Sequence, residues 1–164
     1  MEEIETYKQE VEKNPDDAEA HYNLGVAYYD SGKYQEAIEA CKQVIRLDPD
    51  DAKVHNNLAA AYGKSGKYQE EIESYKQAIK IDPDLAEAHY HLGLAYGESG
   101  MYQEAIESYK QAIRINTDYA EAHFNLGVAY HYSNDRNSAL EQYEILKNLD
   151  PYLANLLFEE IYSE

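Results

Sequence analysis

Hydrophobic residues recur along this chain at helical spacing, in paired stretches separated by short polar turns. Leu24, Ala27 and Tyr28 form one apolar stripe, and a second stripe follows a turn of small and polar residues. The second stripe comprises Ala37, Ile38, Cys41, Val44 and Ile45. Residues three or four positions apart share one face of an α-helix, so each stripe predicts an amphipathic helix. The pattern predicts two helices joined by a tight turn.

This two-helix pattern repeats with a period of 34 residues. The segment that starts at Ala18 returns, with substitutions, from Ala52, Ala86 and Ala120. The four periods follow one another without insertion or deletion. A fixed period of this length is typical of solenoid proteins, in which each repeat buries its apolar face against its neighbours. The sequence therefore predicts an all-α protein made of stacked helix pairs.

Turn residues mark where the predicted helices end and begin. Between the two helices of each period stand Ser31-Gly32, Ser65-Gly66, Ser99-Gly100 and Ser133-Asn134. Glycine and asparagine accept the left-handed backbone that closes a helix C-terminus. Between periods, Asp16, Asp84 and Asp118 each precede a glutamate by three residues. That spacing predicts capping boxes at the start of the following helices.

These signals divide the chain into a capping segment, four repeats and a second capping segment. The predicted bounds are 1–17 for an N-terminal half-repeat or capping helix, 18–51, 52–85, 86–119 and 120–153 for the repeats, and 154–164 for a C-terminal capping helix. We expect them to form one solenoid domain. The last segment suits a cap because Leu157 and Ile161 lie on one side and Glu159 and Glu160 on the other.

The repeat resembles the tetratricopeptide repeat family, whose pattern is W-x2-L-G-x2-Y, then A-x3-F, then P. The matching residues are Leu24, Gly25, Tyr28, Ala37, Cys41 and Pro49; Leu58, Ala59, Tyr62, Tyr75 and Pro83; Leu92, Gly93, Tyr96, Ala105 and Tyr109; and Leu126, Gly127, Tyr130, Ala139, Tyr143 and Pro151. The chain departs from the pattern with histidine at the Trp position of every period and with Glu71 at one Ala position. The resemblance implies a right-handed α-solenoid of antiparallel helix pairs. It also implies that the first helices line a concave face to which extended or helical peptides bind.

Charge narrows the class of partner. Against 14 Lys and Arg the chain has 32 Asp and Glu, a net charge of −18. Such an excess of acid repels phosphate backbones and anionic lipid headgroups, so we expect no nucleic acid partner. No apolar run approaches the roughly 20 residues of a membrane span, which excludes direct membrane insertion. The single Cys41 and an N-terminus without signal-peptide character lead us to expect a cytoplasmic protein.

No pattern in the sequence points to catalysis, a cofactor or a metal. Nucleophile-elbow and phosphate-loop motifs are absent from the sequence. The histidines that recur once per period stand too far apart to share one ion. The Asp-rich turns lack the Gly and Glu positions of a calcium-binding loop. We expect a non-enzymatic protein with no cofactor and no metal site.

A peptide site is predicted on the flank of each first helix opposite its packing residues. The predicted peptide-binding residues are Glu19, Tyr22, Asn23, Val26, Tyr29, Lys53, Asn56, Asn57, Lys64, Tyr90, His91, Leu94, Phe124, Asn125, Val128, His131 and Tyr132. Asn23, Asn57 and Asn125 recur once per repeat. An amide offers a donor and an acceptor, which suits the backbone of an extended peptide.

The predicted groove indicates what such a partner would look like. It carries five carboxylates and two lysines, a net charge of −3. We expect a neutral to mildly basic peptide with apolar or aromatic anchors. The leading hypothesis is a protein-interaction scaffold. Two alternatives stay open, a structural module that self-associates through its terminal helices and the recognition domain of a larger multidomain protein.

Overall fold

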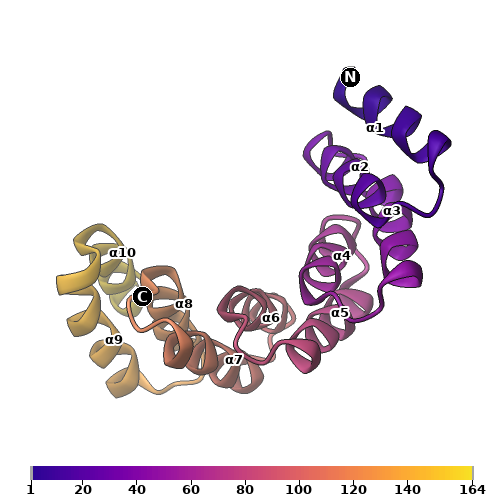
Figure 1. Cartoon of the computed structure of the whole chain (residues 1–164). Coiled ribbons are helices and arrows are strands. Elements are labelled where there is room, and N and C mark those ends of the chain that lie inside the picture. The colour runs from indigo at the N-terminus through magenta and orange to yellow at the C-terminus, as the bar shows by residue number, and fades with distance from the viewer. Residues whose placement is uncertain (1, 164) are drawn as a thin grey trace. The chain divides into compact units, whose positions relative to one another are not determined.

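The computed structural model describes residues 2–163, and within them it contains ten α-helices and no strand (Figure 1). The helices are α1 (Glu2–Lys13), α2 (Ala18–Asp30), α3 (Tyr34–Leu47), α4 (Ala52–Lys64), α5 (Tyr68–Ile81), α6 (Ala86–Glu98), α7 (Tyr102–Ile115), α8 (Ala120–Tyr132), α9 (Arg136–Leu149) and α10 (Pro151–Tyr162). The predicted all-α class and its helix-pair architecture are confirmed. Over the described residues, no helix is both long and apolar enough to cross a bilayer.

The chain divides into two compact units, Met1–Pro83 (unit 1) and Asp84–Glu164 (unit 2). In unit 1 each helix from α1 to α5 packs on the next one, and α2 also touches α4. In unit 2 the same holds from α6 to α10, and α6 also touches α8. The first helices of neighbouring repeats therefore lie side by side within each unit. A single solenoid domain stays a prediction.

Glycine and asparagine end the first helices as predicted. Gly32, Gly66 and Gly100 have φ between 73° and 75°, and Asn134 has φ of 62°. These are left-handed conformations, which glycine adopts without a steric penalty and asparagine tolerates better than most residues. The tight turn between paired helices is therefore confirmed at all four positions.

The N-caps predicted at Asp16, Asp84 and Asp118 are wrong, because the helices begin after Asp17, Leu85 and Tyr119. Helix α2 instead begins after Asp17, whose side chain accepts the backbone N–H of Ala20 at 3.1 Å. The N-cap residues of α6 and α8 are Leu85 and Tyr119, and neither side chain makes a cap hydrogen bond. Each helix starts one residue later than predicted, which moves the glutamate from the third helical position to the second. From there it cannot complete the reciprocal bond of a capping box.

Histidines at the Trp position tie the first helices to the turns that precede them. In three of these histidines the ring Nε2 hydrogen-bonds to the backbone carbonyl oxygen of the residue six positions earlier. The pairs are His21 with Pro15 (2.9 Å), His55 with Pro49 (3.0 Å) and His123 with Thr117 (3.0 Å). A carbonyl oxygen only accepts, so Nε2 carries the proton and donates it. In the part of the chain that is described, no group of three or more His, Cys, Asp or Glu side chains could hold a metal ion.

The second repeat accommodates a glutamate where its neighbours bury alanine. Ala37 and Ala105 are at most 1% exposed at this position, and Glu71 replaces them. An ideal Cβ built on Gly63 would lie 2.5 Å from Glu71 Oε1. The missing side chain of Gly63 therefore provides the room that the carboxylate occupies. At the position of Gly63, the first repeat carries Tyr29 and the last repeat carries His131.

Cys41 occupies the aromatic position of the first repeat, inside the core. Its side chain is 5% exposed and packs with Ile38, Val44 and Leu58. Burial raises the pKa of the thiol from 9.0 to about 11. Because the thiolate is the reactive form, Cys41 is a packing residue in the folded protein.

Candidate functional site

The first helices of unit 1 are joined by a hydrogen bond between Tyr22 and Asn57. Asn57 Nδ2 donates to Tyr22 Oη at 3.3 Å, from α4 to α2. Both side chains are partly buried, and the Tyr22 ring packs against the core of the first two repeats. The bond holds the ring at the edge of the exposed flank of α2 and α4.

The same arrangement recurs in unit 2. Asn125 Nδ2 donates to Tyr90 Oη at 3.2 Å and to the backbone carbonyl of Glu121 at 2.9 Å. Tyr90 also lies beside Tyr119, with ring centroids 4.8 Å apart. We call each of the two bonded pairs, Tyr22 with Asn57 and Tyr90 with Asn125, a Tyr–Asn pair. In both pairs the asparagine lies 35 residues after the tyrosine, on the first helix of the next repeat.

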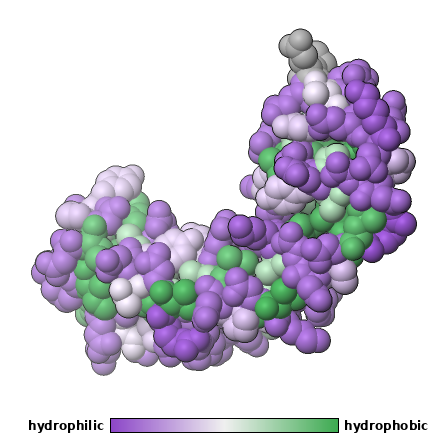
Figure 2. All heavy atoms as spheres, in the orientation of Figure 1, coloured by the Kyte–Doolittle hydropathy of each residue, from purple (hydrophilic) through white to green (hydrophobic). Residues whose placement is uncertain are grey.

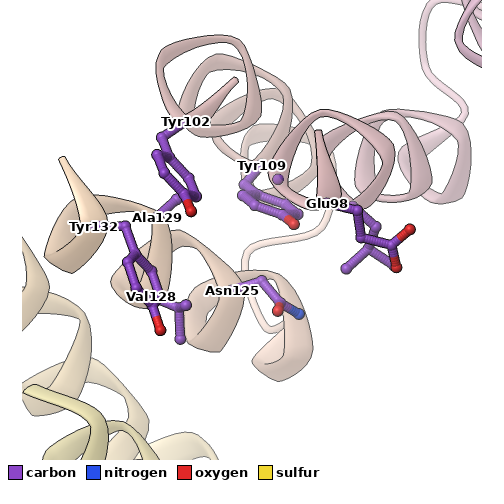
Figure 3. A pocket seen from close by; sticks show the side chains of 9 residues that line it. Glu98, Tyr102, Tyr109, Asn125, Val128, Ala129 and Tyr132 are labelled. Carbon is purple, nitrogen blue, oxygen red and sulfur yellow. The ribbon is translucent and has the colours of Figure 1, made fainter. Parts of the chain in front are cut away.

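A pocket of about 380 Å³ opens beside the second Tyr–Asn pair (Figure 3). It is lined by Leu94, Gly97, Glu98, Tyr102, Tyr109, Asn125, Val128, Ala129 and Tyr132, and we call it the unit-2 pocket. The Tyr102 and Tyr132 rings stack at one end, with centroids 5.3 Å apart and planes at 14°. Figure 3 shows Glu98 at the other end, with Tyr109 and Asn125 between.

Gly97 lines the unit-2 pocket without a side chain of its own. An ideal Cβ at this position would lie 3.7 Å from Tyr109 Oη, so the pocket reaches the hydroxyl of a ring that is only 3% exposed. Tyr29 and His131 stand at the equivalent positions of the first and last repeats. Glycine at this position therefore opens a path from the first-helix flank to α7.

Tyrosines around the pocket stay protonated well above neutral pH. Burial raises the pKa of Tyr90 and Tyr109, and it raises the pKa of Tyr119 from 10.0 to about 12. Neighbouring acidic groups, including Glu98 near Tyr109 and Glu121 near Tyr119, add to the shift. The hydroxyls are therefore neutral donors and acceptors.

These shifts predict a loss of stability in alkali. A tyrosine whose pKa is higher in the folded state binds more protons there, so its stabilising effect is complete below about pH 10 and declines between about pH 10 and 12. The melting temperature, followed by circular dichroism, should fall across this window. Tyr119→Phe should make the fall shallower, because phenylalanine cannot ionise. A melting temperature that is independent of pH up to about 11 would contradict the prediction.

His91 interrupts the asparagine series and contributes little positive charge. Its Nε2 lies 3.6 Å from Glu87 Oε1. Burial lowers the pKa of His91, and the nearby Glu87 opposes that shift without reversing it. The imidazole is therefore neutral near pH 7, and the flank of α6 keeps its acidic character.

The structure brings most of the predicted site residues to the exposed flanks of the first helices. Exposed are Glu19, Val26, Lys53, Lys64 and Tyr132. Partly buried are Tyr22, Asn23, Tyr29, Asn57, Tyr90, His91, Leu94, Phe124, Asn125, Val128 and His131. Phe124 and Val128 also pack against the core formed with α9 and α10. Leu94, Asn125, Val128 and Tyr132 come together in the unit-2 pocket.

Asn56 is the one predicted site residue that the structure buries. Its side chain is 8% exposed, and its Oδ1 has no hydrogen-bond partner among the described residues. The equivalent residues Tyr22, Tyr90 and Phe124 keep part of their larger rings in solvent. A short amide at this position is covered by its neighbours instead.

Five lining residues are not among the predicted site residues: Gly97, Glu98, Tyr102, Tyr109 and Ala129. Tyr102 and Tyr109 lie on α7, the second helix of their repeat, whereas the predicted site was confined to first helices. Tyrosine recurs at both positions in other repeats, which gave neither one a distinguishing mark in the sequence. The signal that could have found them is Gly97, which removes a side chain between the two helices.

Family models describe the repeats that form these flanks. Tetratricopeptide repeat models match residues 18–51, 40–73 and 120–152, and a TPR repeat model matches residues 64–100 and 98–133. The chain belongs to the tetratricopeptide repeat family. Its family and its fold are those of a helical scaffold for protein interactions. A comparison with curated protein sequences finds no match.

Solved TPR structures share the fold over most of their length. A crystal structure of MamA is 29% identical, with a TM-score of 0.87, and covers 93% of this chain and 89% of its own. A second structure of MamA is 30% identical, with a TM-score of 0.79 and coverages of 90% and 84%. YrrB, described as a TPR protein with an unusual peptide-binding site, is 22% identical, with a TM-score of 0.81 and coverages of 95% and 81%.

Proposed function

We propose that this TPR chain is a non-enzymatic interaction module that binds an extended or helical peptide segment of a partner protein. The peptide would lie on the peptide face of either unit, which we define as the exposed flank of α2 and α4 in unit 1 and that of α6 and α8 in unit 2. The observation that carries the proposal is the Tyr–Asn pair, which occurs once in each unit with the same geometry.

Each Tyr–Asn pair leaves hydrogen-bonding capacity for a ligand. An asparagine side chain has two N–H donors and a carbonyl oxygen. Asn57 uses Nδ2 on Tyr22, and Asn125 uses Nδ2 on Tyr90 and on a backbone carbonyl. The carbonyl oxygens remain as acceptors for the N–H groups of a peptide backbone. The paired tyrosine ring fixes the amide in place, so binding does not require the amide to be ordered first.

The charge of the peptide face supports a neutral to mildly basic peptide. The five predicted carboxylates are exposed on it, against two lysines: Glu19, Asp30, Glu87, Glu98 and Glu121, with Lys53 and Lys64. Partly buried rings beside these charges offer apolar contact to aromatic or aliphatic anchors. Acidic segments would be repelled by the same surface.

Peptides selected from a random library on the immobilised chain test the proposal. Asn57→Ala and Asn125→Ala should each weaken the binding of selected peptides about tenfold, since each removes the acceptor and frees the paired tyrosine. Asn155→Ala is the matched control, because Asn155 is exposed on α10 and lies off the peptide face. Calorimetry that shows equal affinities for all three variants and the wild type would refute the proposal.

A self-associating module is the second candidate, favoured by hydrophobic side chains exposed on α9 and α10. In Figure 2 hydrophobic atoms (green) reach the surface over this part of unit 2. Their exposed fractions are 40% for Ile145, 36% for Leu149, 70% for Tyr152, 42% for Phe158 and 48% for Tyr162. Sedimentation velocity distinguishes the candidates, because self-association requires a sedimentation coefficient that rises with concentration.

A further inference from the structure

We propose that the unit-2 pocket binds the side chain of an arginine in the partner peptide. This inference rests on the proposed function and adds the chemistry of one anchor residue. It follows from the size of the pocket, from the hydrogen-bonding groups left open in its wall, and from its charge.

The pocket has the size of a site for one long side chain. Its volume of about 380 Å³ is at the low end of ligand-binding pockets, which hold roughly 300–1,000 Å³. Leu94, Val128 and Ala129 supply apolar wall, and they suit the aliphatic stem of an arginine.

Several hydrogen-bond acceptors line the wall, beside the hydroxyls of Tyr102 and Tyr109, which can donate or accept. The amide of Asn125 is fixed by the carbonyl of Glu121, which can only accept, so Nδ2 faces that carbonyl and Oδ1 remains open. Tyr132 donates its hydroxyl proton to Glu160 Oε1 at 2.7 Å, and its oxygen is left to accept. Glu98 adds a carboxylate that only accepts. A ligand that satisfies the Asn125 and Glu98 acceptors must bring donors.

Charge and aromatic rings favour a donor that is also a cation. Glu98 is the charged residue in the described lining, and no Lys or Arg side chain takes part in it. The stacked rings of Tyr102 and Tyr132 border the pocket, and a cation near such rings is attracted by their quadrupoles.

Arginine fits this wall better than lysine. The open acceptors of Asn125 and Glu98 lie on separate groups, with Glu98 at one end of the pocket (Figure 3). A guanidinium presents five N–H donors in a plane and stacks on aromatic rings, whereas an ammonium is a compact and strongly hydrated point charge. The arginine proposal therefore predicts that the pocket binds an arginine side chain more tightly than a lysine side chain.

The test is an NMR titration of the isotope-labelled full chain with Nα-acetyl-arginine amide and with Nα-acetyl-citrulline amide, its neutral isostere. The arginine probe should shift the amide signals of Leu94, Gly97 and Val128 in a saturable manner. The citrulline probe should bind about tenfold more weakly. Glu98→Gln should weaken the arginine probe about tenfold, while the control Glu104→Gln should not, because Glu104 is exposed on α7 outside the lining.

Equal binding of the two probes, or equal effects of Glu98→Gln and Glu104→Gln, would overturn the arginine proposal. The same variants tested on library-selected peptides separate it from the proposed function. Peptides that respond to Asn57→Ala but not to Glu98→Gln would overturn the arginine pocket while the peptide face stands. Failure to select any binding peptide would overturn both.

Discussion

Replacing Gly93 with alanine is expected to destabilise the protein by about 2 kcal/mol. An ideal Cβ at this position would lie 2.5 Å from Cε1 and 2.7 Å from Cδ1 of the Tyr109 ring. Tyr109 is 3% exposed, and a rigid ring in a packed core cannot move aside without displacing its neighbours. Overpacking of this kind costs up to about 3 kcal/mol, and the higher helix propensity of alanine returns about 1 kcal/mol.

Gly25→Ala is the matched control for this prediction, because Gly25 is the equivalent glycine of the first repeat. Its ideal Cβ would approach Ala40 Cβ no closer than 3.3 Å, and the second repeat already carries Ala59 at the same position. We expect a change of about 0.5 kcal/mol or less, of either sign. Guanidinium denaturation followed by circular dichroism measures both variants. Equal destabilisation of the two would show that Tyr109 does not fill the space beside Gly93.

Leu157→Ala is expected to cost about 3–4 kcal/mol and to loosen α8, α9 and α10 together. Leu157 is 0% exposed and packs in one cluster with Ala139, Leu146 and Ile161. Its methyl groups also fill the space beside Gly127 on α8, where an ideal Cβ would meet Cδ2 at 2.4 Å. Removing a fully buried leucine leaves a cavity in addition to the lost burial.

The control for this variant is Leu149→Ala, the same substitution at a leucine that is 36% exposed on α9. Partial exposure reduces both the burial and the cavity, so we expect a loss of about 1 kcal/mol. Denaturation gives the free energies, and amide hydrogen exchange locates the loosened helices. A similar loss for both variants would argue against α10 as the cap of this hydrophobic core.

Periodicity predicted the helices of this chain well because it reflects burial directly. Residues at the repeated apolar positions, such as Ile38, Ile106 and Leu146, are at most 3% exposed. The turns were equally clear, since a left-handed residue must close each first helix and Gly32 and Asn134 can do so. These features depend on local sequence and on a pattern repeated four times.

Helix starts and side-chain exposure were harder to predict because they depend on neighbours. Asp16 and Asp17 are both competent caps, and only the folded backbone selects Asp17. Asn56 follows the repeat position of Tyr22, but its shorter side chain is covered. The unit-2 pocket arises between helices where Gly97 lacks a side chain, and a linear pattern does not show which residues line such a gap.

Chemical-shift mapping of a library-selected peptide on the isotope-labelled full chain tests the peptide face most directly. We predict shifts concentrated on the exposed flanks of α2, α4, α6 and α8, with the side-chain amide signals of Asn57 and Asn125 among those that move. Shifts confined to α3, α5 and α9, with both asparagine side chains unaffected, would contradict binding at the Tyr–Asn pairs.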